Sequence, residues 1–223
     1  MTVDGPSGSG KGTVSRAAAK ALGWSLLDSG ALYRLVALGA RKARIDLNDE
    51  SRLRELAGRL DIRFDSGPTG AEIVRLWGED VTRDIRTESA GNDASKVAAL
   101  PAVRSALLER QRRFAVPPGL VADGRDMGTV VFPDARVKIF LTASADERAA
   151  RRYKQLKEKG VAATLPGLSK EIAERDQRDI TRTASPLVAS EDAVLVDTTG
   201  LSIDAVVERV LEIVRKRLSL EVL

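Results

Sequence analysis

The chain has 223 residues, of which 43% are hydrophobic and 4% aromatic, and it contains no cysteine and no histidine. These two absences exclude disulfides, thiolate nucleophiles, zinc held by cysteine or histidine, and a Ser-His-Asp triad. The net charge of +4 and the pI near 9.5 are mildly basic, which suits polyanionic small molecules as well as nucleic acid.

We expect a cytoplasmic protein that acts as a monomer and binds neither membranes nor nucleic acid. No apolar run approaches the roughly 18 residues of a membrane span. The first residues, Met1 to Asp4, lack the charged and apolar regions of a signal peptide. Aromatic side chains are too scarce for the stacking surfaces of a single-strand binder.

Helical and strand-like segments alternate along most of the chain, which predicts an α/β protein with a mainly parallel sheet. Strands are expected at residues 1–4, 120–123, 137–141 and 193–197, and the apolar runs at 120–123 and 137–141 are typical of buried strands. Helices are expected at residues 11–22, 31–43, 51–60, 88–99, 101–114, 146–159, 169–182 and 203–218. Ser144 with Glu147 forms a capping box, residues 160–167 are expected to be a loop, and Ser202 caps the last helix.

The first strand is short, because only Met1 to Asp4 precede Gly5. Two interpretations are open: a chain shortened at its N-terminus, or a frayed strand at the edge of the sheet.

Between the predicted helices at 51–60 and 88–99 the pattern becomes β-rich. Residues 62–65 and 72–77 read as short antiparallel strands around a turn at 66–70, with 78–80 following the second strand. This predicts an insertion of two or three strands.

A glycine-rich loop lies between the first strand and the first helix. Its glycines let successive backbone N–H groups point at one centre, the helix N-terminus adds partial positive charge, and Lys11 reaches the β- and γ-phosphates. The spacing and the strand–loop–helix context predict a nucleoside triphosphate site. Its residues are Gly5, Pro6, Ser7, Gly8, Ser9, Gly10, Lys11, Gly12 and Thr13.

This loop departs from the usual pattern at one position. A serine or threonine normally follows the lysine and contacts Mg²⁺, but here Gly12 stands there and Thr13 comes next. We therefore expect Mg²⁺ to be held through Thr13 or, largely through waters, by a carboxylate such as Asp123 at the end of a buried strand. The alternative for Asp123 is a helix cap or turn former.

Three further motifs make the sequence similar to the bacterial cytidylate kinases. They are Asp28 to Arg34 (DSGALYR), Ala122 to Ala135 (ADGRDMGTVVFPDA), and Arg175 to Asp179 (RDQRD) followed by Arg182. The resemblance implies a single P-loop NTPase domain over 1–223, of three-layer α/β/α type with a central parallel sheet. It also implies a β-rich substrate-binding insertion at 58–98 and a helical lid at 148–168.

The resemblance also implies transfer of the ATP γ-phosphoryl group to CMP or dCMP with Mg²⁺, and roles for individual residues. Lys11, Asp123, Arg125 and Arg151 would be catalytic. The acceptor phosphate would be bound by Ser29, Arg34, Arg125 and Arg182, and the cytosine by Ser95 and Arg104 with Asp126 nearby. Arg175 and Asp179 would contact the ribose, and Arg151 and Arg152 would belong to the lid over ATP.

The chemistry of the residues agrees, because guanidinium groups bind phosphate oxygens in bidentate fashion and the attacking phosphate oxygen needs no general base. Arg148, Arg178 and Arg209 are instead expected to be solvated surface residues. Ser95, Arg34, Arg104 and Arg182 could also be explained by their helices alone. The rival functions are phosphorylation of another acceptor such as AMP or UMP, a GTPase switch, and a nucleic-acid-dependent ATPase. No guanine-reading Asn-Lys-x-Asp is present.

Overall fold

The structure is a computed structural model that describes residues 1–66, 72–158 and 160–218. The chain divides into two compact units, one formed by Met1–Asp28 with Arg112–Leu223 and the other by Ser29–Gln111. The predicted insertion at 58–98 lies inside the second unit. Over the described residues, no helix is both long and apolar enough to cross a lipid bilayer.

The first unit is built on a five-stranded sheet in the order β2-β6-β1-β7-β8, with all neighbouring pairs parallel. This confirms the predicted α/β class. The strands are β1 (Thr2–Asp4), β2 (Ser25–Asp28), β6 (Leu120–Gly124), β7 (Lys138–Thr142) and β8 (Val194–Asp197).

The position of β1 corrects one expectation. The strand lies in the middle of the sheet, between β6 and β7, so a frayed edge strand is wrong. Its three residues are all buried, and hydrogen bonds from strands on both sides hold it in place despite its length. The phosphate-binding loop therefore starts from the centre of the sheet.

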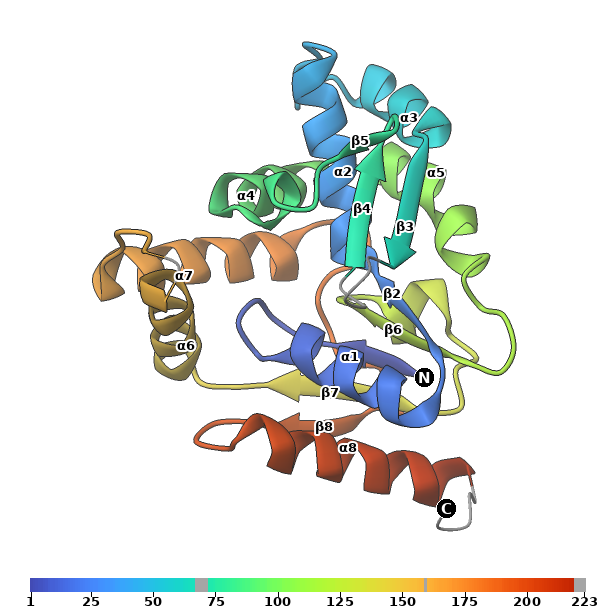
Figure 1. Cartoon of the computed structure of the whole chain (residues 1–223), viewed down its shortest axis with the longest axis vertical. Coiled ribbons are helices and arrows are strands. Elements are labelled where there is room, and N and C mark those ends of the chain that lie inside the picture. Colours follow the sequence, from blue (N-terminus) through green and yellow to red (C-terminus); the bar gives the residue numbers. More distant parts are fainter. Residues whose placement is uncertain (67–71, 159, 219–223) are drawn as a thin grey trace. The chain divides into compact units, whose positions relative to one another are not determined.

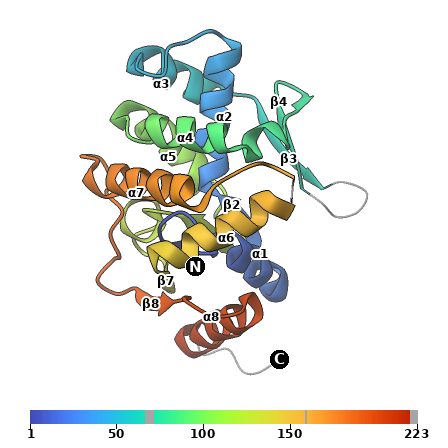
Figure 2. The ribbon, with the colours of Figure 1, turned by 90° about the vertical axis from the view of Figure 1, so that its left-hand side faces the viewer.

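Helices flank this sheet (Figure 1). They are α1 (Lys11–Leu22), η2 (Met127–Val131, one π-type turn), α6 (Ala145–Glu158), α7 (Leu165–Thr181) and α8 (Ile203–Leu218). Helices α1 and α8 run side by side in both views (Figures 1 and 2). Val14 and Ala18 of α1 join Val206 and Val210 of α8 in one buried apolar cluster with the strand residues. Burial of this apolar surface is what joins the helices to the sheet.

Most predicted boundaries in this unit are confirmed to within a few residues. Ser202 caps α8, as predicted, by accepting from the N–H of Ala205 at 3.2 Å. Helix α7 begins at Leu165, four residues before the predicted start, because Thr164 caps it by accepting from the N–H of Gly167. The predicted end of α6 at Lys159 lies outside the described residues.

The second unit contains α2 (Ser29–Lys42), α3 (Glu50–Arg59), η1 (Asp84–Arg86), α4 (Glu88–Val97) and most of α5 (Pro101–Arg112). Its antiparallel sheet has the order β3-β4-β5, with strands Ile62–Ser66, Glu72–Leu76 and Glu79–Asp80. The β-rich insertion is thus confirmed with three strands, while most of its predicted turn, residues 67–70, lies outside the described residues. Strands β4 and β5 join through Trp77 and Gly78, whose φ angles of 54° and 81° are those of a two-residue hairpin turn.

Candidate functional site

The glycine-rich loop joins the central strand β1 to helix α1, and two of its glycines are required by their surroundings. Gly5 has φ +150°, and a Cβ there would lie 2.1 Å from the carbonyl oxygen of Leu141 in β7. Gly8 has φ +80°, and its Cβ would lie 2.9 Å from the Cβ of Arg148. The loop therefore packs directly on β7 and α6, as only glycine allows.

Lys11 begins α1 and folds back over this loop. Its Nζ donates to the carbonyl oxygen of Pro6 at 3.0 Å. Burial, and then the positive charge of Arg125, lower the pKa of Lys11 to about 8. The negative charge of Asp123 acts in the opposite direction. A lysine held against a loop of this kind is suited to contact phosphate oxygens.

Asp123, near the end of β6, lies beside Gly12. A Cβ on Gly12 would be 3.2 Å from Oδ2 of Asp123, so the carboxylate lies close to the space that a serine or threonine side chain would take at this position. Burial raises the pKa of Asp123 to about 7 against the opposing charge of Lys11, and Asp28 and Asp4 raise it further. The departure at Gly12 thus makes room for a carboxylate next to the loop.

These residues fit a Mg²⁺ ion. Oδ1 of Asp123 is buried and has no hydrogen-bond partner among the described residues. Within the same residues no group of three or more Asp or Glu side chains forms a ready-made cation cage, which matches the way Mg²⁺ uses one or two carboxylates and keeps several waters. Thr13, the other predicted ligand, is exposed on α1.

Arginines from the turn after β6 and from α7 come together next to the loop. Arg125 and Asp179 form an ion pair with little exposure to solvent. Burial disfavours the charged form of both groups, but the charges of Arg125 and its neighbours outweigh it and lower the pKa of Asp179. Arg182 lies 4.0 Å from Asp126, both side chains being buried. Arg175 also lowers the pKa of Asp179. The structure therefore brings together the Arg125, Asp126, Arg175, Asp179 and Arg182 predicted from two distant motifs.

Asp4 is a site residue that sequence reasoning missed. Its carboxylate accepts from the backbone N–H groups of Met127 and Gly128, each at 2.8 Å. Burial raises the pKa of Asp4 to about 6. Asp4 thereby joins the strand that enters the phosphate loop to the turn that carries Arg125. The only signal in the sequence is its place directly before Gly5.

Arg148 corrects the sequence prediction, because it is not a solvated surface residue. Its side chain is 7% exposed and forms a bidentate ion pair with Asp176 of α7, at 3.1 and 2.6 Å. It also donates to the carbonyl oxygens of Ser7, at 3.0 Å, and of Ala143, at 3.1 Å. Arg209 is exposed as predicted, and Arg178 is half-buried.

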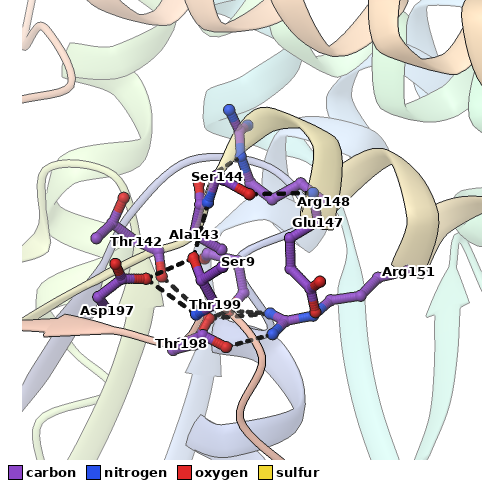
Figure 3. Close-up of polar contacts among 10 residues, drawn as sticks. All are labelled: Ser9, Thr142, Ala143, Ser144, Glu147, Arg148, Arg151, Asp197, Thr198 and Thr199. Atoms are coloured by element: carbon purple, nitrogen blue, oxygen red, sulfur yellow. Dashed lines mark hydrogen bonds and ion pairs between the residues drawn. The ribbon is translucent and has the colours of Figure 1, made fainter.

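The two predicted lid arginines differ in their surroundings. Arg151 pairs with Glu147 at 2.8 Å and donates to Oγ1 and the carbonyl oxygen of Thr198, at 2.9 and 2.5 Å (Figure 3). Arg152 donates to Gln155 at 3.1 Å, and burial lowers its pKa. Arg151 is thus bound to the end of β8, while Arg152 bonds to Gln155 of its own helix and also feels the charge of Glu171 in α7.

In the second unit, the candidates Ser29, Arg34, Ser95 and Arg104 all have buried or half-buried side chains. Arg34 donates to the carbonyl oxygens of Ile85 and Thr87, at 2.7 and 3.2 Å. Arg104 donates to the carbonyl oxygen of Ala98 at 3.0 Å and lies over the ring of Tyr33, 5.5 Å from its centre. Such ordered arginines are not the solvated helix residues of the alternative interpretation.

Comparison with known proteins shows the family to which the chain belongs. The family model for cytidylate kinase matches residues 1–216. The cytidylate kinase of Azotobacter vinelandii is 58% identical over 97% of this chain and 95% of its own, and that of Proteus mirabilis is 56% identical over 97% and 96%. A crystal structure of TT1252 from Thermus thermophilus is a distant match, with 21% identity and a TM-score of 0.46 over 97% of this chain and 96% of that one. From the length and identity of these matches, the chain belongs to the cytidylate kinase family.

Proposed function

We propose that this chain transfers the γ-phosphoryl group of ATP to CMP and dCMP, producing ADP and the corresponding diphosphate. The family match over residues 1–216 carries the choice of acceptor, because a P-loop fold by itself serves many acceptors. The structure supplies the chemistry: a phosphate loop with its lysine, a carboxylate beside it, and a group of arginines from α7 and the turn after β6.

In this proposal the first unit binds ATP. The N–H groups of the loop and Lys11 would hold the β- and γ-phosphates, and Asp123 would hold Mg²⁺. The bound Mg²⁺ would neutralise charge that develops on the phosphate oxygens. Arg125 and Arg182 would bind the acceptor phosphate and stabilise the transition state, and Arg151 and Arg152 would act on the ATP side.

The remaining roles concern the acceptor nucleoside. Ser95, Arg104 and Asp126 would bind cytosine, Arg175 and Asp179 the ribose, and Ser29 and Arg34 the phosphate. No general base is needed, because the attacking atom is an oxygen of a phosphate that is already ionised. We also retain the expectation that the chain works as a monomer without nucleic acid.

A coupled assay of ATP consumption over CMP, dCMP, UMP and AMP tests this function. We expect CMP and dCMP to have the highest kcat/KM and the reaction to depend on Mg²⁺. A preference for AMP or UMP would refute the acceptor assignment while leaving the kinase assignment intact. Asp179→Asn should change CMP and dCMP turnover to different extents if Asp179 contacts the ribose, and equal losses would count against that role.

A further inference from the structure

The carbonyl oxygens of the phosphate loop are bound by side chains from distant parts of the first unit. Ser7 O accepts from Nη1 of Arg148 at 3.0 Å, across 141 residues of sequence. Ser9 O accepts from Oγ1 of Thr198 at 3.2 Å, across 189 residues. Nη1 of Arg151 lies at 3.4 Å from the same Ser9 oxygen. Neither Arg148 nor Thr198 has a role in the function proposed above.

Both side chains are fixed before they meet the loop. The guanidinium of Arg148 is held by Asp176 on one side and by the carbonyl oxygen of Ala143 on another. Thr198 is 1% exposed. Its hydroxyl oxygen accepts from Arg151, and the hydroxyl donates to the carbonyl oxygens of Ser9, at 3.2 Å, and Thr142, at 3.0 Å. Figure 3 shows these groups converging from α6 and the end of β8 on Ser9 and Ala143. A rigid donor restrains its acceptor more than a mobile one does.

Holding these carbonyl groups has a consequence on the opposite side of the loop. A trans peptide is planar, and its C=O and N–H point in opposite directions. The Ser7 carbonyl shares its peptide with the N–H of Gly8, and the Ser9 carbonyl shares its peptide with the N–H of Gly10. Both glycines have positive φ, 80° and 87°, and glycine peptides rotate with little steric resistance. Without the two donors these peptides could turn away from an anion.

We propose that Arg148 and Thr198 are positioning residues of the phosphate loop, which fix the N–H groups of Gly8 and Gly10 towards the phosphates of the donor nucleotide. This proposal depends on the function proposed above in one respect, which is that the donor nucleotide is ATP and its product ADP. The hydroxyl of Thr198 bonds to Ser9, Thr142 and Arg151, none of which belongs to the proposed acceptor site, so its loss should weaken nucleotide binding at the donor site and leave the acceptor site unchanged. Arg148 also pairs with Asp176 of α7, the helix that carries Arg175 and Asp179, so the effect on the acceptor site is judged from Thr198 alone.

Thr198→Val and Thr198→Ser give the cleaner test, since valine keeps the shape of threonine and lacks only the hydroxyl. We expect Thr198→Val to raise the dissociation constant for ADP, measured by calorimetry, and the KM for ATP by about 3- to 10-fold. The KM for CMP should stay within about twofold, and Thr198→Ser should bind ADP as the unmodified protein does. If Thr198→Val acted only through lost packing, Thr198→Ser would not restore ADP binding, and the KM values for ATP and CMP would change together.

Arg148→Met should weaken ADP binding by about 10-fold or more, since its bond to Ser7 is charge-assisted. The double variant Arg148→Met/Asp176→Asn avoids leaving an unpaired carboxylate, and Arg209→Met on the exposed face of α8 is the matched control. Unchanged ADP binding in folded Thr198→Val and in the double variant would overturn the proposal, as would equal losses of ADP and CMP binding in Thr198→Val. Calorimetry measures ADP binding without any acceptor. Its result therefore stands even if the assay over CMP, dCMP, UMP and AMP refutes the proposed acceptor.

Discussion

Asp123 is a buried carboxylate whose protonation differs between the folded and unfolded chain. It titrates at 3.8 when unfolded and at about 7 when folded. Between these values the folded state keeps a proton that the unfolded state has lost, so raising the pH through this window lowers the free energy of unfolding. Above about pH 7 this loss is complete. In our proposal Asp123 holds Mg²⁺, so this loss of stability is the cost of keeping a buried carboxylate at the site.

Asp123→Asn removes this pH dependence and should become progressively more stable than the unmodified protein as the pH rises from 5 to 7. The difference should level off above pH 7 at about 1–3 kcal/mol, reduced by the loss of the favourable charge of Asp123 on Lys11. Thermal unfolding of the nucleotide-free proteins across this range measures it. The variant should also lose Mg²⁺-dependent activity. A stability difference that does not vary with pH would contradict the assigned pKa.

Arg125 serves a structural ion pair and, in our proposal, the reaction. Arg125→Ala would remove the ion-pair partner of the buried Asp179 and leave only the more distant charges of Arg175 and Arg182; loss of a partner from a buried pair commonly costs about 3–5 kcal/mol. Arg125→Lys keeps the charge and loses the bidentate geometry, so it separates the two roles. We expect kcat to fall by about 100-fold or more with a small change in melting temperature.

Steady-state kinetics and thermal unfolding of Arg125→Lys check this expectation, with Arg209→Lys on the exposed face of α8 as the control. Near-normal kcat in Arg125→Lys would remove the guanidinium geometry from the mechanism. A large loss of stability would mean that lysine cannot replace arginine in the ion pair.

At the scale of elements, the phosphate loop depends on close packing against β7. Gly5→Ala would place a Cβ 2.1 Å from Leu141 O at a φ of +150°, and backbone on a central strand cannot move aside cheaply. We expect a loss of about 3 kcal/mol or more in the free energy of unfolding. Gly58→Ala in α3, where a Cβ meets nothing within 4 Å, should instead be neutral or stabilise by up to about 1 kcal/mol.

Chemical denaturation of both glycine variants gives the comparison directly. If Gly5→Ala were as stable as the unmodified chain, the loop would have to lie farther from β7 than the structure places it. Because Gly58→Ala also replaces glycine with alanine, this variant controls for the effect of alanine on the unfolded chain.

At the scale of the whole molecule, the phosphate loop of the proposed donor site lies in the first unit, whereas part of the proposed acceptor site lies in the second. The loop residues 5–13 belong to the first unit, and Arg34, Ser95 and Arg104 belong to the second. Hydrogen exchange should therefore slow in residues 5–13 on adding ADP and in residues 88–112 on adding CMP, because a ligand protects the elements it orders. Protection of residues 5–13 alone by both nucleotides would contradict the placing of the cytosine site in the second unit.

The sequence determined the features that depend on neighbouring residues. The strand–loop–helix at Gly5 to Lys11, the caps at Ser144 and Ser202 and the alternation of strands and helices follow from local conformation and periodicity. The motif around Arg125 and the one around Asp179 also indicated functional residues, although 54 residues separate them.

Only the tertiary structure decided which charged residues are buried and what they contact. Arg148 looked like one more arginine on a charged helix, yet Ser7, 141 residues away, and Asp176 enclose it. Asp4 looked like the end of a short strand, yet it binds N–H groups more than 120 residues away. The position of β1 at the centre of the sheet likewise depends on pairing with strands distant in the sequence. Helical periodicity tells which side of a helix a residue occupies, but the partner that covers that side is set by packing between distant segments.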